Sequence, residues 1–299
     1  MADRGILTVV LACAEPGKPT LSDSVAAVQR ELDEVGGELL LVASPASRAS
    51  VEAFATHSGA RCIASKGHLV PELWGDGWRA SSGGAVAFLI PECQVRPGWA
   101  RTLLAELDRG AGGAGGYFAL HPAADATDAA VYFLRYAAFS DAAHPTRDVE
   151  DIAGDNAVYS RTVLARHAAS FANGFWEVDL HRKLRAERVR LVMAGGAVAE
   201  FSGAPRLAAM ARQRLTHGRH FGAWRAAQGG RSPLVALLLA PAVPVVLMAR
   251  IIRRVWARAS ERGRLIAALP ALVVLSCAWA LGEALGALGS ATQLHEATE

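Results

Sequence analysis

The first 200 residues alternate short, unbroken apolar runs with segments in which apolar residues recur every three or four positions. Unbroken runs are typical of strands buried on both faces, and the periodic segments are typical of amphipathic helices. Strands are predicted over 6–12, 38–44, 61–64 and 85–90, and helices over 20–35, 47–59 and 72–84. Repeated strand–helix units predict an α/β fold with a mostly parallel, Rossmann-like sheet and flanking helices.

Ligands of such sheets bind beyond the carboxyl ends of the strands. Here the first, second and fourth strands end at 12–15, 44–45 and 91–93. The glycine-rich segment 109–118, RGAGGAGGYF, lacks the Gly-Lys-Ser/Thr ending of a phosphate loop and follows a helix instead of opening one. We expect this segment to be a flexible turn.

The character of the chain changes after residue 202. A basic, partly amphipathic helix is followed by two apolar runs, 233–249 and 265–282, which approach the roughly 20 residues needed to cross a bilayer. Arginine clusters beside these runs favour membrane attachment over the alternative, a hydrophobic hairpin buried in a soluble core. The predicted organisation is a catalytic domain over 1–203, a basic juxtamembrane helix over 204–231, two membrane-embedded segments within 232–290 and a tail over 291–299.

Six arginines lie between the two apolar runs, and the positive-inside rule places them in the cytoplasm. Pro233, Pro241 and Pro244 suit a broken or re-entrant first run, with the second run crossing the membrane. Two complete crossings are the alternative. The opening apolar run ends in Glu-Pro-Gly and is typical of a strand, not of a signal peptide. We therefore expect a cell-membrane protein whose catalytic domain faces the cytoplasm.

Composition narrows the function classes. The 299 residues carry a net charge of +3, which is too small to indicate nucleic-acid binding. The four cysteines are scattered without a Cys-x-x-Cys pair, so neither a zinc ribbon nor a disulfide framework is predicted, and a reducing compartment fits best. No Gly-x-Gly-x-x-Gly follows the first strand, which argues against a nucleotide-binding oxidoreductase.

Four stretches, in this order, resemble the family 2 glycosyltransferases, which have a GT-A fold. They are the opening strand with its helix, GDGWRASSGGAVAFLIPECQVRPGW (75–99), IAGDNAVYSRTVL (152–164) and GFWEVDLHRKL (174–184). The basic helix and the apolar C-terminal segments resemble the membrane-attached branch. The resemblance implies an inverting transferase that moves a sugar from a nucleotide-sugar to a hydroxyl acceptor, either a lipid-linked or an envelope glycan. The alternative is a non-catalytic, membrane-bound scaffold that keeps the fold.

The resemblance also assigns the donor side. The family's Asp-x-Asp metal motif falls on Ile90, Pro91 and Glu92, so the first acid is lost and Glu92 remains as an oxygen ligand for Mg²⁺ or Mn²⁺. An ordinary solvated role for Glu92 is the alternative. The expected donor-binding residues are Ala12, Glu15, Ser44, Arg79, Pro91, Arg212 and Arg214. Arg212 and Arg214 carry guanidinium groups that can bind phosphate oxygens, either of the donor or of anionic lipid headgroups.

The fourth stretch carries the expected catalytic base. Glu177 takes the position of the family's catalytic acid, and Asp179 is the alternative candidate for the catalytic base. A helix beginning near Trp176 places Glu177 in its first turn, and Asp179 then pairs with Arg182 or Lys183. An acidic turn that merely favours the helix is the alternative. The expected acceptor-binding residues are Asp155, Asn156, Trp176 and His181.

Overall fold

The computed structural model describes residues 6–140, 145–172, 174–203, 206–227 and 233–296. They form two compact units, an α/β unit (Met1–His121 and Phe139–Gly203) and a helical unit (Pro122–Ala138 and Ala204–Glu299). Parts of all four predicted segments lie outside the described residues: 1–5, 141–144 and 173 of the catalytic domain, 204–205 and 228–231 of the basic helix, 232 of the membrane-embedded segments and 297–299 of the tail.

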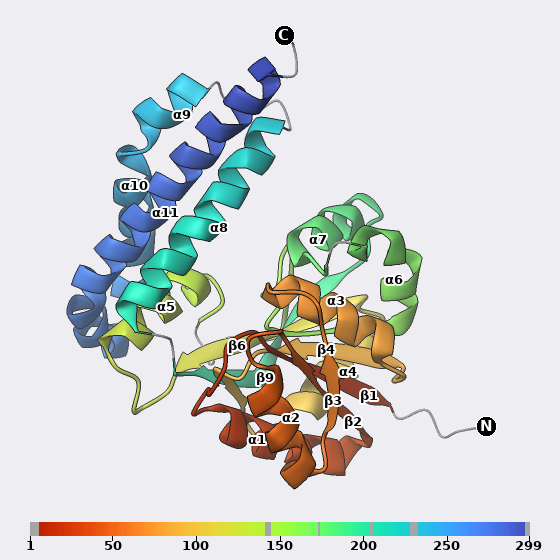
Figure 1. Cartoon of the computed structure of the whole chain (residues 1–299). Coiled ribbons are helices and arrows are strands. Elements are labelled where there is room, and N and C mark those ends of the chain that lie inside the picture. The colour runs from red at the N-terminus through yellow and green to blue at the C-terminus, as the bar shows by residue number, and fades with distance from the viewer. Residues whose placement is uncertain (1–5, 141–144, 173, 204–205, 228–232, 297–299) are drawn as a thin grey trace. The chain divides into compact units, whose positions relative to one another are not determined.

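The strands and helices expected in the first 90 residues are confirmed in number, type and order. The strands are β1 (Leu7–Cys13), β2 (Gly37–Ala43), β3 (Arg61–Ala64) and β4 (Ala85–Leu89), and the helices are α1 (Leu21–Val35), α2 (Arg48–Ser58) and α3 (Val70–Ala80). The four strands are parallel, so their carboxyl ends lie at one edge of the sheet (Figure 1).

The rest of the sheet is mixed. Its order is β3-β2-β1-β4-β8-β6-β9-β5, with β7 paired to β9. The added strands are β5 (Cys93–Val95), β6 (Gly113–Leu120), β7 (Arg147–Val149), β8 (Asn156–Ser160) and β9 (Leu191–Phe201). Because β8 is antiparallel to β4, its first residue, Asn156, pairs with the last residue of β4, Leu89. The loop before β8 therefore lies at the carboxyl edge of the parallel strands.

The expectation of a flexible turn over 109–118 was wrong for residues 113–118, which belong to strand β6 between β8 and β9, whereas 109–110 form a turn. The glycines are required by close packing. A β-carbon added at Gly113 would lie 2.6 Å from the Tyr159 ring, and one at Gly115 would lie 2.7 Å from Ile152. Composition alone suggested a turn, whereas the neighbouring side chains fill the space that the missing side chains leave.

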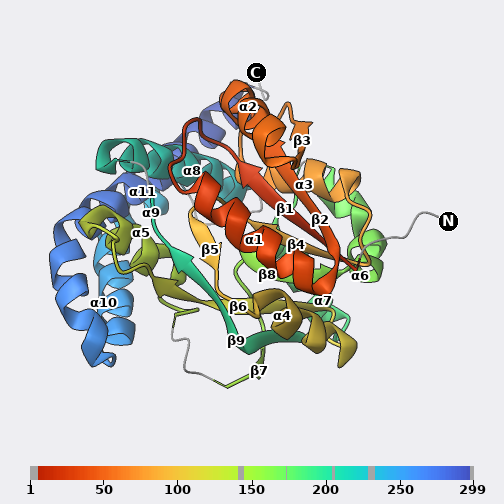
Figure 2. The same cartoon turned by 90° about the horizontal axis from the view of Figure 1, so that it is seen from below.

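Helices cover both faces of the sheet. Helices α1 and α4 (Trp99–Asp108) lie over one face (Figure 2), and α3 lies over β1 and β2 on the other. The contact under α3 is close, since a β-carbon added at Gly77 would lie 2.2 Å from Val10. Helix α3 therefore packs closely on the middle of β1.

The helical unit contains α5 (Ala126–Tyr136), α8 (Leu207–Ala227), α9 (Pro233–Leu239), α10 (Ala242–Trp256) and α11 (Arg262–Glu296). The first apolar run is broken between α9 and α10 at Ala240 and Pro241, as its prolines suggested. Among the described residues, one segment, Ala259–Gly289, is long and apolar enough to cross a membrane, with a mean hydropathy of 2.2.

Helices α8 and α11 pack against each other through glycines. A β-carbon added at Gly222 would lie 2.1 Å from the Glu283 carbonyl oxygen, and one at Gly286 would lie 2.0 Å from that of Arg219. Small residues let the two backbones approach this closely, as is common between membrane helices. Arg225 of α8 also forms an ion pair with Glu283 of α11.

Candidate functional site

The segment before α7 (Glu177–Ala186) is attached to α3. The Phe175 backbone N–H donates to the Pro71 carbonyl oxygen at 2.7 Å. Gly174 has φ of +104° and a β-carbon there would lie 3.0 Å from Pro71, so only glycine suits this approach. This attachment fixes where α7 begins.

Glu177 is the first residue of α7, and Trp176 is its N-cap, as predicted from the sequence. A β-carbon added at Gly154 would lie 3.1 Å from both the Glu177 carboxyl carbon and the Trp74 ring, so the three residues are in close contact. The Trp74 indole N–H donates to the Leu89 carbonyl oxygen at 3.0 Å. The half-buried Glu177 carboxyl group thus lies at the edge where β4 ends and β8 begins.

Asp179 forms the ion pairs expected from its spacing. Its two carboxylate oxygens lie 2.7 Å from Arg182 and 2.7 Å from Lys183. The hydrogen bond from Lys183 and the two positive charges outweigh partial burial and lower the pKa of Asp179. Two cations thus hold Asp179 as a carboxylate, which makes it a weaker proton acceptor than an unpaired acid.

His181 is fully buried behind Glu177, between two other side chains. Its Nε2 lies 2.8 Å from the Tyr159 hydroxyl oxygen, and its Nδ1 lies 3.3 Å from Asp151 Oδ1. The ring is therefore hydrogen-bonded to Tyr159 at Nε2, whereas Nδ1 lies near the Asp151 carboxylate without a hydrogen bond to any residue that the structure describes. Burial, Glu177 and Asp151 raise the pKa of Tyr159 well above 10, so the phenol remains a neutral donor.

The other expected acceptor residues lie in different surroundings. Asn156 is buried, and its amide accepts from the Trp99 indole N–H at 2.7 Å and donates to the Tyr117 carbonyl oxygen at 3.0 Å. Asp155 is also buried. Trp176, the residue before Glu177, is 47% exposed. Asn156 and His181 are thus buried residues that stabilise the structure beneath the site, whereas the exposed Trp176 side chain is accessible to a ligand.

On the donor side, Glu92 lies in the turn after β4 and is paired with Lys18. The Lys18 Nζ atom lies 2.7 Å from Glu92 Oε1 and 2.9 Å from Glu15 Oε2. Burial opposes the charge on Lys18, but the hydrogen bonds and charges of Glu92 and Glu15 outweigh it and raise the pKa of Lys18. Glu15 and Glu92, expected separately in the donor site, are thus joined by one ammonium group.

The surroundings of Glu92 do not provide a ligand set for a divalent cation. Ile90 is a buried hydrocarbon, and burial together with Glu92 raises the pKa of the nearby Cys13, which stays a thiol. In the part of the chain that the structure describes, no three His, Cys, Asp or Glu side chains form a group that could hold a metal ion. Mg²⁺ and Mn²⁺ prefer several oxygen ligands, so the residues around Glu92 do not fit them.

The ends of β1 and β2 are joined by hydroxyl groups. Ser44 is buried and its hydroxyl donates to the Ala14 carbonyl oxygen at 2.7 Å. The Pro91 carbonyl oxygen accepts from the Ser24 hydroxyl at 2.5 Å. Ala12 is buried within β1. Ser44 and Pro91 therefore fix the backbone of the loops around Lys18.

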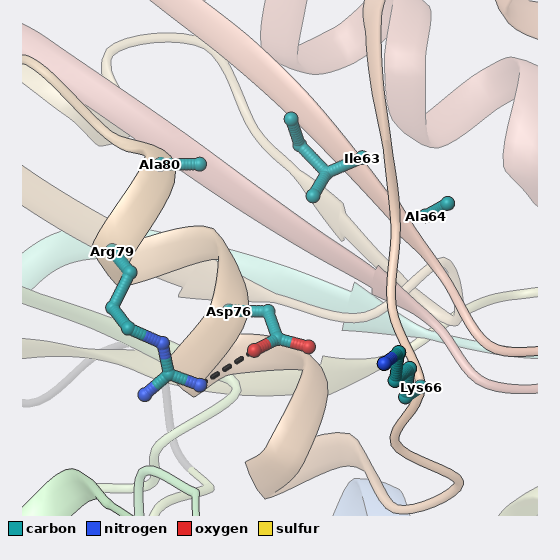
Figure 3. Close-up of a pocket in the computed structure, with 6 residues that line it drawn as sticks. All are labelled: Ile63, Ala64, Lys66, Asp76, Arg79 and Ala80. Atoms are coloured by element: carbon teal, nitrogen blue, oxygen red, sulfur yellow. Dashed lines mark hydrogen bonds and ion pairs between the residues drawn. The ribbon is translucent and has the colours of Figure 1, made fainter.

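Arg79 lies elsewhere on the α/β unit. A cavity of about 480 Å³ is lined by Ile63, Ala64, Lys66, Asp76, Arg79 and Ala80 (Figure 3). Arg79 is ion-paired with Asp76 at 2.5 Å, and the neighbouring Ala80 carbonyl accepts from Arg61, the first residue of β3. The Arg79 guanidinium also donates to the Phe171 carbonyl oxygen at 3.1 Å, so Arg79 is engaged by Asp76 and Phe171 and not by Glu92.

Arg212 and Arg214 belong to α8 of the helical unit. The Arg214 guanidinium carbon lies 4.4 Å above the centre of the Trp279 ring, a cation–π contact with α11. Arg212 is exposed. Their expected roles at the donor or at lipid headgroups remain predictions.

No protein-family model matches the chain, and no curated protein matches it in sequence. Among solved structures, the chain is similar to GalNAc-T7 with UDP, GalNAc and Mn²⁺, with a TM-score of 0.51 and 11% identity over 68% of this chain and 44% of that one. The α/β unit has a GT-A-like fold.

Two further structures match at lower scores. Glucosyl-3-phosphoglycerate synthase from Mycobacterium tuberculosis, with Mn²⁺, UDP and phosphoglyceric acid, has a TM-score of 0.48 and 18% identity over 72% of this chain and 76% of that one. A mannosyltransferase from Pyrobaculum calidifontis, with GDP-Man and Mn²⁺, has a TM-score of 0.47 and 16% identity over 99% of this chain and 80% of that one. The chain spans under half the length of GalNAc-T7.

Four residues of the GT-A-like unit were not singled out from the sequence. They are Lys18, Trp74, Asp151 and Tyr159, each of which contacts or neighbours an expected site residue. Lys18 carried one available signal, because lysine is rare in this chain and this one follows directly on the first strand's Glu-Pro-Gly turn. No sequence pattern marked Trp74, Asp151 or Tyr159, because these residues come close to the site only when the chain is folded.

Proposed function

We propose that the protein is an inverting glycosyltransferase that moves a sugar from a nucleotide-sugar to a hydroxyl acceptor. The observation that carries this proposal is the position of Glu177. Its carboxyl group lies against Gly154 and Trp74, and Trp74 is hydrogen-bonded to the last residue of β4, next to the turn that carries Glu92. A proton acceptor and the donor-side turn are thus close to one sheet edge, where ligands of such folds bind. The GT-A-like fold and the similar structure of GalNAc-T7, which contains UDP, support the same class.

The reaction assigns a task to each group. The acceptor oxygen forms a bond to the anomeric carbon as the bond from that carbon to the diphosphate oxygen breaks, and the electron pair leaves with the diphosphate. Glu177 takes the acceptor's proton. Attack opposite the leaving group inverts the configuration, and no covalent enzyme intermediate is needed. The exposed Trp176 ring provides an apolar face on which a sugar ring can stack.

Around the base, protein groups fix its position. Glu177 lies in the first turn of α7, where the helix dipole favours its charged form. His181, held by Tyr159 and Asp151, packs one turn further along the same helix and keeps α7 against the sheet. Glu177 is therefore preorganised, which is the main requirement for general-base catalysis.

The acceptor proposed is a lipid-linked or envelope glycan, and the proposed location is the cell membrane with the α/β unit in the cytoplasm. Support comes from the apolar segment Ala259–Gly289 and from exposed apolar side chains such as Leu238 and Val245, 78% and 67% exposed. Sedimentation of the full chain tests this proposal. Recovery in the membrane fraction, resistant to carbonate and released by detergent, supports it, and recovery in the supernatant without detergent contradicts it.

The test of the catalytic proposal is a donor screen. The full chain is heated with UDP- and GDP-sugars, and a donor that raises the melting temperature is then followed for release of nucleoside diphosphate with acceptor lipids. Glu177→Gln should keep the thermal shift and lose the release. A shift without release in the unmodified protein, over a broad acceptor panel, would favour the second candidate, a non-catalytic scaffold, which the Lys18–Glu92 ion pair also favours because it replaces a metal motif.

A further inference from the structure

Three charged groups converge at the donor-side turn of the α/β unit. The Lys18 ammonium lies between Glu92 and Glu15, at 2.7 and 2.9 Å, and the Lys18 side chain is only 9% exposed. Glu92 is 13% exposed and Glu15 is 39% exposed. Lysine is rarely buried to this extent unless it is paired. The contacts of Lys18 are therefore part of the folded interior and differ from those of a mobile surface lysine.

The ammonium occupies the place next to Glu92 that a divalent cation requires. A metal bound to Glu92 would lie about 2.0–2.6 Å from a carboxylate oxygen. Lys18 Nζ is 2.7 Å from Glu92 Oε1, so a divalent cation at that carboxylate would be repelled by an ammonium group a few ångströms away. The side chains on either side of the turn, Ile90 and Cys93, supply no carboxylate that would favour the metal over the lysine.

We propose that Lys18 takes the part of the metal ion, so that this chain binds the diphosphate of its donor without a divalent cation. This inference rests on the proposed function. Lysine is a common phosphate ligand because its compact ammonium acts as a point charge with three donors. Glu92 then positions the lysine and contacts no metal, which explains how the site retains one acid where the resemblance leads us to expect two.

The two carboxylates have different roles in this arrangement. Glu92 is nearly buried and anchored in the turn after β4, so it holds Lys18 permanently. Glu15 is the more exposed partner and lies in the loop after β1. An incoming diphosphate would displace Glu15 from the ammonium while Glu92 remains. Glu15 thus satisfies Lys18 in the empty site and competes with the ligand.

Calorimetric titration of the full chain with UDP and with GDP tests the inference. Each titration is run with EDTA and with Mn²⁺, on the unmodified protein and on variants. The unmodified protein should bind one of these nucleotides in EDTA, and Mn²⁺ should change the dissociation constant by less than about threefold. Lys18→Met should weaken binding in EDTA by about tenfold or more, the usual loss for a charged hydrogen bond. Arg101→Met, which removes an exposed cation of α4 in the same unit, should leave binding unchanged.

Glu92→Gln separates the lysine site from a metal site. If Glu92 held a metal, its replacement by an amide would abolish Mn²⁺-dependent binding. Here Lys18 keeps its charge, so Glu92→Gln should weaken binding in EDTA by less than Lys18→Met does, and Mn²⁺ should not change the result. Lys18→Met leaves two carboxylates facing each other, so the double variant Lys18→Met/Glu92→Gln is included as a charge-balanced form. It should show the same loss as Lys18→Met.

The outcomes are distinguishable. Binding only with Mn²⁺, lost in Glu92→Gln, would overturn the inference and leave the glycosyltransferase proposal in place. If Lys18→Met and Lys18→Met/Glu92→Gln both bind the nucleotide as the unmodified protein does, the inference is likewise overturned and the glycosyltransferase proposal stays in place. If neither UDP nor GDP binds with or without Mn²⁺, and no nucleotide-sugar gives a thermal shift, the proposed function itself falls and the inference falls with it.

Discussion

Gly154 and Glu177 are in direct contact: a β-carbon added at Gly154 would lie 3.1 Å from the Glu177 carboxyl carbon. Gly154 belongs to the loop before β8, and Glu177 opens α7, so this contact joins two segments that are distant along the chain. The space that the glycine leaves is taken by the acid and by the Trp74 ring.

Gly154→Ala is expected to displace the Glu177 carboxylate and so to slow sugar transfer by about tenfold or more, since misplacement of a reacting group by about 1 Å is that costly. The free energy of unfolding should fall by roughly 1–3 kcal/mol, the usual cost of overpacking. Gly84→Ala is the matched control, because its added carbon would lie 3.7 Å from the nearest atom. If Gly154→Ala and Gly84→Ala transfer sugar at equal rates, the contact between Gly154 and Glu177 is not needed to position the carboxylate.

Tyr159→Phe removes the hydroxyl that lies 2.8 Å from His181 Nε2. A buried ring nitrogen then loses its partner, and urea denaturation should show a loss of about 1–3 kcal/mol. Tyr117→Phe serves as the comparison, because the Tyr117 hydroxyl donates to the carbonyl of Pro145, an exposed residue where water can replace it. The Tyr117 loss should be smaller, and the reverse order would argue against a structural role for the His181 contacts.

Acid stability should depend on Asp151. The neighbouring His181 ring and the charge of Arg185 lower the pKa of Asp151 below its ordinary value of 3.8 despite partial burial. A carboxyl group with a lowered pKa in the folded state adds stability above its unfolded pKa and loses it as the pH falls through the folded one. Unfolding midpoints should therefore decline below about pH 4.

Asp151→Asn should make that decline shallower, by less than about 1 kcal/mol because the group is half exposed. The remaining slope includes Asp179, whose pKa is lowered by Lys183 and Arg182. Identical slopes with and without Asp151 would show that its pairing with His181 contributes nothing.

Gly222→Leu tests the close packing of α8 on α11. The added side chain meets the Glu283 backbone at 2.1 Å, so the helices must separate, and the helical unit should become protease-sensitive at lower temperature. Gly263→Leu, near the start of α11, meets nothing within 4 Å and controls for helix propensity. If both variants resist proteolysis alike, the glycines are not needed for the helix contact.

Strand and helix order through β4 followed from the sequence, because buried parallel strands give unbroken apolar runs. The first turn of α7 and the pairs of Asp179 with Arg182 and Lys183 were also predictable, since they depend on spacing within one helix. The glycine-rich strand β6 was not, because its glycines are explained only by the side chains of Ile152 and Tyr159 that lie against it.

The donor-side turn shows the same limit. Glu92 and Glu15 were identified as separate candidates, whereas their shared partner Lys18 depends on how the loop after β1 folds over the turn after β4. Arg79 is near Glu92 in the chain, but its guanidinium is engaged by Asp76 and by the Phe171 carbonyl oxygen. At this turn, therefore, the distance between residues along the chain did not predict which charged side chains form ion pairs in the fold.

The central claim is that Glu177 takes the proton of the acceptor. Its most direct test is the single-turnover rate of sugar transfer, with the donor identified by thermal shift, in Glu177→Gln and in Asp179→Asn. We expect Glu177→Gln to lower the rate by about 10²–10⁴-fold with the melting temperature and donor affinity kept, and Asp179→Asn to lower it by less than about tenfold. A rate in Glu177→Gln close to that of the unmodified protein would contradict the account.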